Sequence, residues 1–120
     1  MFKVYFYKNK NGKSPVLDYL RELIEKNDKD SRIKANKILT YIDYLEKHGT
    51  QAKEPYAKYL SGDIWELRPL KDRILYAAQS DKGFILLHIF RKSTQKTPKR
   101  EVEKAKRNLT DYENRGEEHG

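Results

Sequence analysis

Residues 64–92 read IWELRPLKDRILYAAQSDKGFILLHIFRK, and this stretch decides the fold. It contains three apolar runs that are separated by short segments rich in Pro, Asp, Lys and Gly. Such runs predict consecutive antiparallel strands joined by tight connections. The predicted strands are Ile64–Leu70, Arg73–Ser80 and Phe84–Lys92. The last is apolar at nearly every position, which is typical of a central strand covered on both faces.

The residues before this stretch predict one further strand and a pair of helices. Apolar residues alternate over residues 2–6, a period of two that indicates a strand with one buried face. The Ser14–Pro15 pair starts a helix, and a second helix runs from about residue 30 to Gly49, packed on the first as a hairpin. The predicted apolar stripes are Val16, Leu17, Leu20, Leu23 and Ile24 in the first helix and Ile33, Ala35, Ile38, Leu39, Ile42 and Leu45 in the second.

The remaining segments complete an α+β pattern. Residues 50–62 contain a proline and no clean period, which favours a loop with room for one turn or short strand. The Thr97–Pro98 pair opens a final helix, and residues 113–120 are expected to fray. The element order βααβββα predicts a single domain over residues 1–120, with helices on one face of an antiparallel or mixed four-stranded sheet.

Composition narrows the function. Lys and Arg number 26 against 18 Asp and Glu, for a formal charge of +8. This surplus favours a polyanionic partner, nucleic acid first, although it also serves to keep a small protein in solution. No cysteine occurs, and the three histidines are scattered, so we expect neither a disulfide nor a metal site nor a cofactor. No apolar run is long enough for a membrane span, which favours a cytoplasmic protein.

Strand periodicity predicts a charged group on one face of the sheet. Glu66 and Arg68 share a face of the first predicted strand in 64–92, and a four-residue connection then places Arg68 opposite Arg73 and Glu66 opposite Leu75. A second connection of two or four residues extends this face to the third strand, whereas a bulge would reverse the pattern. The predicted group is Glu66, Arg68, Arg73, His88 and Lys92. The residues left for the helix-covered core are Ile85, Leu87 and Ile89.

Such a group suits cleavage of RNA by attack of its own 2′-hydroxyl, which needs a proton acceptor, a proton donor and cations around the phosphorane, and no metal. Arg68 and Arg73 carry planar forks that fit phosphate oxygens. Lys92, if desolvated among cations, suits proton transfer, with Glu66 or His88 as alternative bases. The competing interpretation is a solvated face on which Glu66 neutralises an arginine.

A basic run follows the third strand, with the sequence RKSTQKTPKR at residues 91–100. It places cations at a strand end and a helix start, where backbone amides can also meet phosphate. The run predicts an RNA track, although a loop that is simply polar fits equally well. Its cations besides Lys92 are Arg91, Lys96, Lys99 and Arg100.

Several other side chains allow two interpretations. His88 either contacts RNA or is a packed core histidine, and the second is the more common case. Trp65 and Tyr76 are expected in the core, although Trp65 also suits base stacking. The tyrosines Tyr41, Tyr44, Tyr56 and Tyr59 fit either a partner interface or packing.

The segments IWELRPLKDRILYAAQ and FILLHIFRKSTQKTPKREVEKAKRNL resemble the phage-derived HigB-like branch of the RelE/ParE toxin superfamily. The resemblance lies in WELR at 65–68, an arginine before LY at 75–76, and the pattern F-x-K-x-x-x-x-T-P-x-x-E-x-x-x-A from Phe90. It covers about half the chain densely and the whole chain in element order. It implies a RelE-like fold and a type II toxin that acts as a ribosome-dependent mRNA endonuclease.

The resemblance also implies partners and site residues. The partners are the ribosome with its mRNA and a HigA-like helix-turn-helix antitoxin, in a heterotetramer or larger complex. The matching catalytic positions are Arg68, Arg73 and Lys92, with Glu66 nearby. Some relatives use a histidine or tyrosine near the C-terminal end as acid or base, where this chain has Tyr112. The alternatives are a ParE-like toxin that binds gyrase without cutting and a non-catalytic nucleic-acid-binding module.

Overall fold

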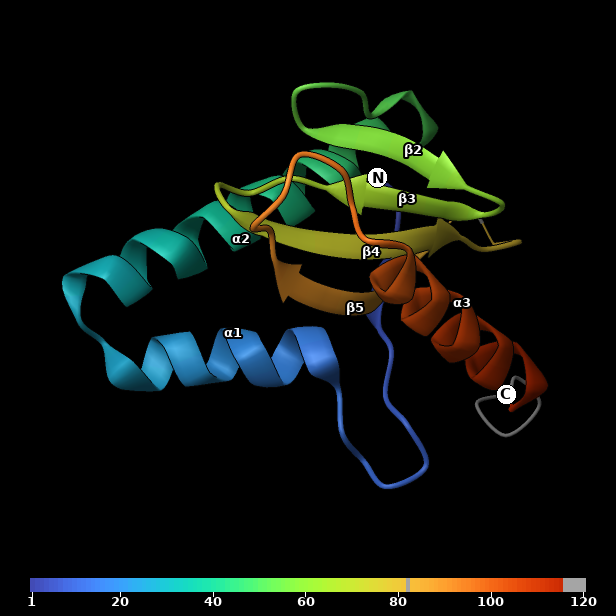
Figure 1. The fold of residues 1–120 in the computed structure, drawn as a ribbon, viewed down its shortest axis with the longest axis horizontal. Coiled ribbons are helices and arrows are strands. Elements are labelled where there is room, and N and C mark those ends of the chain that lie inside the picture. The colour runs from blue at the N-terminus through green and yellow to red at the C-terminus, as the bar shows by residue number, and fades with distance from the viewer. Residues whose placement is uncertain (82, 116–120) are drawn as a thin grey trace.

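A computed structural model describes residues 1–81 and 83–115 (Figure 1). In this part of the chain five strands form one mixed sheet in the order β1-β5-β4-β3-β2. The strands are β1 (Val4–Phe6), β2 (Ala57–Ser61), β3 (Ile64–Leu67), β4 (Asp72–Ala78) and β5 (Phe84–Arg91). β1 is parallel to β5, and the other neighbours are antiparallel. The α+β class is therefore confirmed.

The predicted count of four strands is wrong, because β2 adds an edge strand within residues 50–62. The pairing of β2 with β3 shifts register between Tyr59 and Ser61. A bulge interrupts the alternation of side chains, so the segment shows no clean period of two. The short strand that the sequence left open is the one that forms.

The helices are α1 (Pro15–Lys26), α2 (Lys29–His48) and α3 (Lys99–Asn114), with a 3-10 turn, η1 (Gly49–Gln51), after α2. Pro15 stands in the first turn of α1, as predicted. α2 begins slightly earlier than predicted, because the Asp28 side chain accepts a hydrogen bond of 2.8 Å from the Ser31 amide and caps the helix.

The helices cover both faces of the sheet, so the prediction that they lie on one face is wrong (Figure 1). The α1–α2 hairpin packs on the strand residues Leu67, Ile74, Tyr76, Phe84 and Leu86. Through Ala105 and Leu109, α3 packs on the opposite face, against Ile64, Leu75, Ala77, Ile85 and Leu87. The apolar run of β5 explains the arrangement, because a strand that is apolar on both sides buries both of them.

The pairing of the central strands confirms part of the predicted face. Glu66 lies opposite Leu75, and Leu75 lies opposite His88. A register shift between Leu75 and Tyr76 then changes the alternation along β5. Ile85 and Leu87 consequently lie on the α3 side, on the same face as Glu66, where the sequence had assigned them to the other face. Ile89 packs on the hairpin side as predicted.

The hairpin buries a narrower stripe than its sequence suggests. Ile24, Ile33 and Leu39 are exposed, although each was predicted on an inner face. Figure 1 shows that the turn between α1 and α2 projects beyond the sheet, so the helix ends that meet at this turn lie away from the strands. The buried apolar positions of the two helices are Val16, Leu20, Leu23, Ala35, Ile38, Ile42 and Leu45.

The end of α3 is tied to the N-terminal segment. Asp111 accepts a hydrogen bond of 2.6 Å from the Tyr7 hydroxyl and one of 2.8 Å from Arg115 Nη2. Arg115 Nη2 also donates to the carbonyl of Lys8, at 2.6 Å. Residues 113 and 114 of the predicted frayed tail therefore belong to a helix, and residues 116–120 lie outside the described part of the chain.

Gly49→Ala is expected to lower the free energy of unfolding by about 2 to 4 kcal/mol. Gly49 ends α2 at a φ of +55°, and a methyl group there would overlap the ring of Phe2. Gly12→Ala is the matched control, because Gly12 also has a positive φ, +84°, but open space around it. Urea unfolding of both variants measures the difference, and an equal loss would show that only the backbone conformation matters.

Candidate active site

The four predicted catalytic residues come together. Glu66 lies in β3 and Arg68 just after it, Arg73 lies in β4, and Lys92 directly follows β5. Glu66 Oε2 is 3.6 Å from Arg68 Nε and 4.0 Å from Arg73 Nε. Lys92 lines the same cleft as Glu66 and Arg68. We call these four residues the cationic cluster.

The cationic cluster is less open than predicted. Glu66 is only 1% exposed and Arg73 9%, whereas the Arg68 side chain is 25% exposed. The sequence predicted an uncovered sheet face. Figure 1 shows why this was wrong: the segment between β5 and α3 crosses over β3 and β4 before α3 begins.

Thr97 fixes this crossing segment to the cluster. Its hydroxyl donates a short hydrogen bond to Glu66 Oε1. Both carboxylate oxygens of Glu66 are therefore engaged, one by Thr97 and the other by the two arginines. Sequence reasoning missed this role because the Thr97–Pro98 pair looked like a helix start. The structure shows no side-chain cap at the start of α3, so the Thr97 hydroxyl contacts Glu66 instead.

Arg73 has a donor without a partner. Its Nη1 donates to the carbonyls of Leu70 and Asp72, each at 2.8 Å. Its buried Nε has no hydrogen-bond acceptor among the described residues. Burial lowers the pKa of Arg73, and the charge of Glu66 opposes this shift. A buried N–H without an acceptor costs free energy, and Glu66 Oε2, at 4.0 Å, is too far from this Nε to accept a hydrogen bond from it.

Lys92 has an altered proton affinity for two reasons. Desolvation lowers the pKa of Lys92, and the positive charges of Arg73 and Arg68 lower it further, while Glu66 opposes them. The lysine is half-buried, and its side chain lines the cleft. The cluster sets three cations against one carboxylate. It therefore attracts an anion and holds a lysine that loses its proton more readily than a free one.

His88 was predicted among the RNA contacts, and the structure pairs it with a carboxylate of α3. Its Nε2 is 2.7 Å from Glu101 Oε1, and its ring stacks on Phe90 at a centroid distance of 6.0 Å. Phe90, not His88, lies opposite Arg73 in the β4–β5 ladder. His88 lines a different cleft, between α1 and α3, so it is not part of the cationic cluster.

Of the remaining predicted RNA contacts, one lines the cleft of the cluster and three do not. All four are exposed, and they are Arg91, Lys96, Lys99 and Arg100. Lys96 lines the cleft of the cationic cluster. Arg91 lies opposite Asp72 at the end of the ladder. Lys99 and Arg100 each have a carboxylate within 4 Å, from Glu103 and Glu101, so part of their charge is balanced locally.

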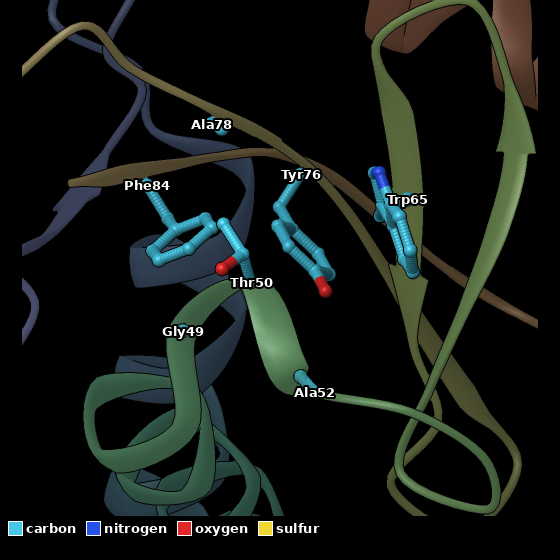
Figure 2. A pocket seen from close by; sticks show the side chains of 7 residues that line it. All are labelled: Gly49, Thr50, Ala52, Trp65, Tyr76, Ala78 and Phe84. Atoms are coloured by element: carbon cyan, nitrogen blue, oxygen red, sulfur yellow. The ribbon is translucent and has the colours of Figure 1, made fainter. Parts of the chain in front are cut away.

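A small apolar pocket lies on the hairpin side of the sheet, and Figure 2 shows the rings of Phe84, Tyr76 and Trp65 along it. Tyr76 is buried as predicted, and burial raises the pKa of its phenol. The pocket is lined by Gly49, Thr50, Ala52, Trp65, Tyr76, Ala78 and Phe84. None of these side chains carries a charge, so the pocket suits packing better than chemistry.

Two further features bear on function. In residues 1–81 and 83–115, no three His, Asp or Glu side chains gather closely enough to hold a metal ion. None of the described helices has the length and apolar character to span a bilayer.

The fold and the cluster define a class: a small basic α+β protein in which two arginines and a lysine gather near a buried carboxylate. A family model for the phage-derived Gp49-like proteins (DUF891) matches residues 18–110, which include the whole cationic cluster. The chain belongs to this family, whose members are toxins of the RelE/HigB type. No curated protein matches the chain. The predicted toxin class is confirmed at this level, and HigB itself stays a prediction.

Proposed function

We propose that this protein is the toxin of a type II toxin–antitoxin system and that it cuts mRNA on the ribosome. The observation that carries the proposal is the gathering of cations around the buried carboxylate of Glu66: Arg68 and Arg73 lie within 4.0 Å of it, and Arg68 and Lys92 line one cleft with it. Membership of a toxin family of the RelE/HigB type supports it. The proposed partners are a HigA-like helix-turn-helix antitoxin, in a heterotetramer or larger complex, and the translating ribosome of the cytoplasm.

The proposed reaction uses groups of the substrate, of the cluster and of water. The 2′-hydroxyl of the RNA attacks the adjacent phosphorus and its proton passes to a water molecule, while the bond to the 5′-oxygen breaks and that oxygen takes a proton from the cluster. The products are a 2′,3′-cyclic phosphate and a 5′-hydroxyl. Arg68 and Arg73 stabilise the charge of the phosphorane.

Lys92 is the proposed proton donor to the leaving 5′-oxygen, because its environment weakens its hold on a proton. Glu66 is better suited to orienting the two arginines than to acting as the base, since both of its oxygens are already engaged. His88 belongs to another cleft, so it has no role in this step.

The test uses ribosomes programmed with labelled mRNA and the purified protein. We expect cleavage that leaves cyclic phosphate ends, and no cleavage of mRNA with a 2′-deoxy nucleotide at the cut site. Cleavage of the deoxy substrate, or 3′-hydroxyl products, would contradict attack by the 2′-hydroxyl. If wild-type protein cuts nothing, a binding role becomes the better explanation, such as the inhibition of gyrase.

A further inference from the structure

Three tyrosines form an aromatic stack beside the cationic cluster. Tyr41 and Tyr44 come from α2, and Tyr56 comes from the segment before β2. The rings of Tyr44 and Tyr56 stack at 4.2 Å with an angle of 21°, and Tyr41 meets Tyr56 at 5.3 Å. Tyr56 nevertheless remains 37% exposed. We call these residues the tyrosine stack.

The tyrosine stack adjoins Arg68 through the backbone of Tyr56. The Arg68 amide donates a hydrogen bond of 3.0 Å to the Tyr56 carbonyl, which continues the pairing of Ala57 with Leu67. Tyr56 is therefore the neighbour of Arg68 across the ladder.

This placement matches the build of a nucleotide, which carries a flat base next to an anionic phosphate. Aromatic rings bind bases of any sequence, because every base offers a π-face. Tyr44 stacks on one face of the Tyr56 ring, so the orientation of the Tyr56 ring is set before a ligand arrives. Although its ring contacts two others, the Tyr56 residue is still 37% exposed, next to Arg68.

We propose that Tyr56 is a stacking platform for a nucleobase of single-stranded RNA next to the phosphate held by Arg68 and Arg73. This inference rests on the proposed function, and it adds a base-binding position that the cationic cluster lacks. The ring makes the contact, so the phenol oxygen is dispensable. A protein ligand is the less favoured occupant, because the border of the stack is cationic and the chain carries a charge of +8.

The experiment measures two quantities for each variant: the mRNA concentration for half-maximal cleavage on ribosomes, and the affinity for an uncuttable 2′-O-methyl oligonucleotide. For Tyr56→Ala we expect each to weaken by roughly 5- to 100-fold. Tyr56→Phe keeps the ring and should stay within about twofold of wild type. Leu39→Ala is the matched control, because Leu39 is also exposed, at 47%, on α2.

A change in the RNA separates stacking from damage to the fold. One abasic nucleotide next to the cut should weaken wild type as much as Tyr56→Ala does, and it should have no effect on that variant. An abasic site far from the cut should leave both proteins unchanged. The melting temperature of each variant identifies loss of fold independently.

The outcomes for the two proposals differ. If wild type cuts and Tyr56→Ala cuts and binds equally well, the stacking platform is wrong and the nuclease stands. If wild type cuts nothing, yet Tyr56 and the abasic site still affect oligonucleotide affinity together, the platform stands and the nuclease is wrong. If Tyr56→Ala retains RNA binding but loses a protein partner, the surface is a protein interface and the inference is overturned.

Discussion

Arg73→Ala should lower the rate of mRNA cleavage by roughly 100- to 1,000-fold, the usual effect of removing one donor to a developing oxyanion. Arg73 is the cluster member best placed for this role, because it is held by two backbone carbonyls and keeps a buried Nε without an acceptor. A single-turnover assay on programmed ribosomes measures the rate. Arg73→Lys keeps the charge but not the fork, so it should recover only part of the activity.

The same change should also destabilise the fold by about 3 kcal/mol. Arg73 is buried, so its loss leaves Glu66 with fewer cations and the Leu70 and Asp72 carbonyls without their donor. Gly49→Ala is a suitable control, since it lowers stability by a similar amount on the hairpin side of the sheet. If Gly49→Ala loses as much activity as Arg73→Ala, the effect comes from unfolding, and Arg73 has no chemical role.

The grouping of the cluster could be predicted because strand periodicity is a local property. Side chains two residues apart share a face, and the turn around Pro69 fixes the pairing, so Glu66 falls opposite Leu75 as expected. The shift in register near Leu75 did not separate the cluster, because Arg73 and the end of β5 lie on the same side of it. The assignments of Ile85 and Leu87 were wrong because these residues lie beyond it.

The sequence could not predict that the segment between β5 and α3 covers the cluster, because this segment has no periodicity from which its path could be inferred. Thr97 meets Glu66 across 31 positions of sequence, and His88 meets Glu101 across 13. Neither contact has a pattern that strand or helix spacing would reveal. Both contacts follow from the position of α3 on the Glu66 side of the sheet. The sequence analysis expected helices on the other face only, so it did not predict either contact.

Burial changes what the cluster can do. On an open sheet face, water would screen the three cations, and a pair such as Arg68 with Glu66 would contribute little. Beneath the crossing segment their fields are screened less, so each charge acts more strongly on its neighbours and on a bound phosphate. The altered pKa of Lys92 is one result, and this makes the lysine the most informative position for a pH experiment.

Lys92→Ala should lower the rate of cleavage by roughly 100- to 10,000-fold, the range of general acid catalysis. Because Lys92 is half-buried and no hydrogen bond of its side chain is seen among the described residues, the melting temperature should change little. Lys37→Ala is the control for loss of one positive charge, since Lys37 is exposed on α2. If the two variants cut equally well, Lys92 is not the proton donor.

The pH dependence of the cleavage rate also tests Lys92 as the proton donor, because a general acid predicts the direction in which the rate changes. A general acid must be protonated, so the rate should fall as pH rises through the pKa of Lys92, which lies below the ordinary lysine value of 10.5. Arg68→Ala removes one of the charges that lower this pKa, so the fall should move to higher pH in that variant. The fall should disappear from the residual activity of Lys92→Ala. A fall that stays at the same pH in all three proteins belongs to another group, and the proton that reaches the 5′-oxygen would then come from elsewhere.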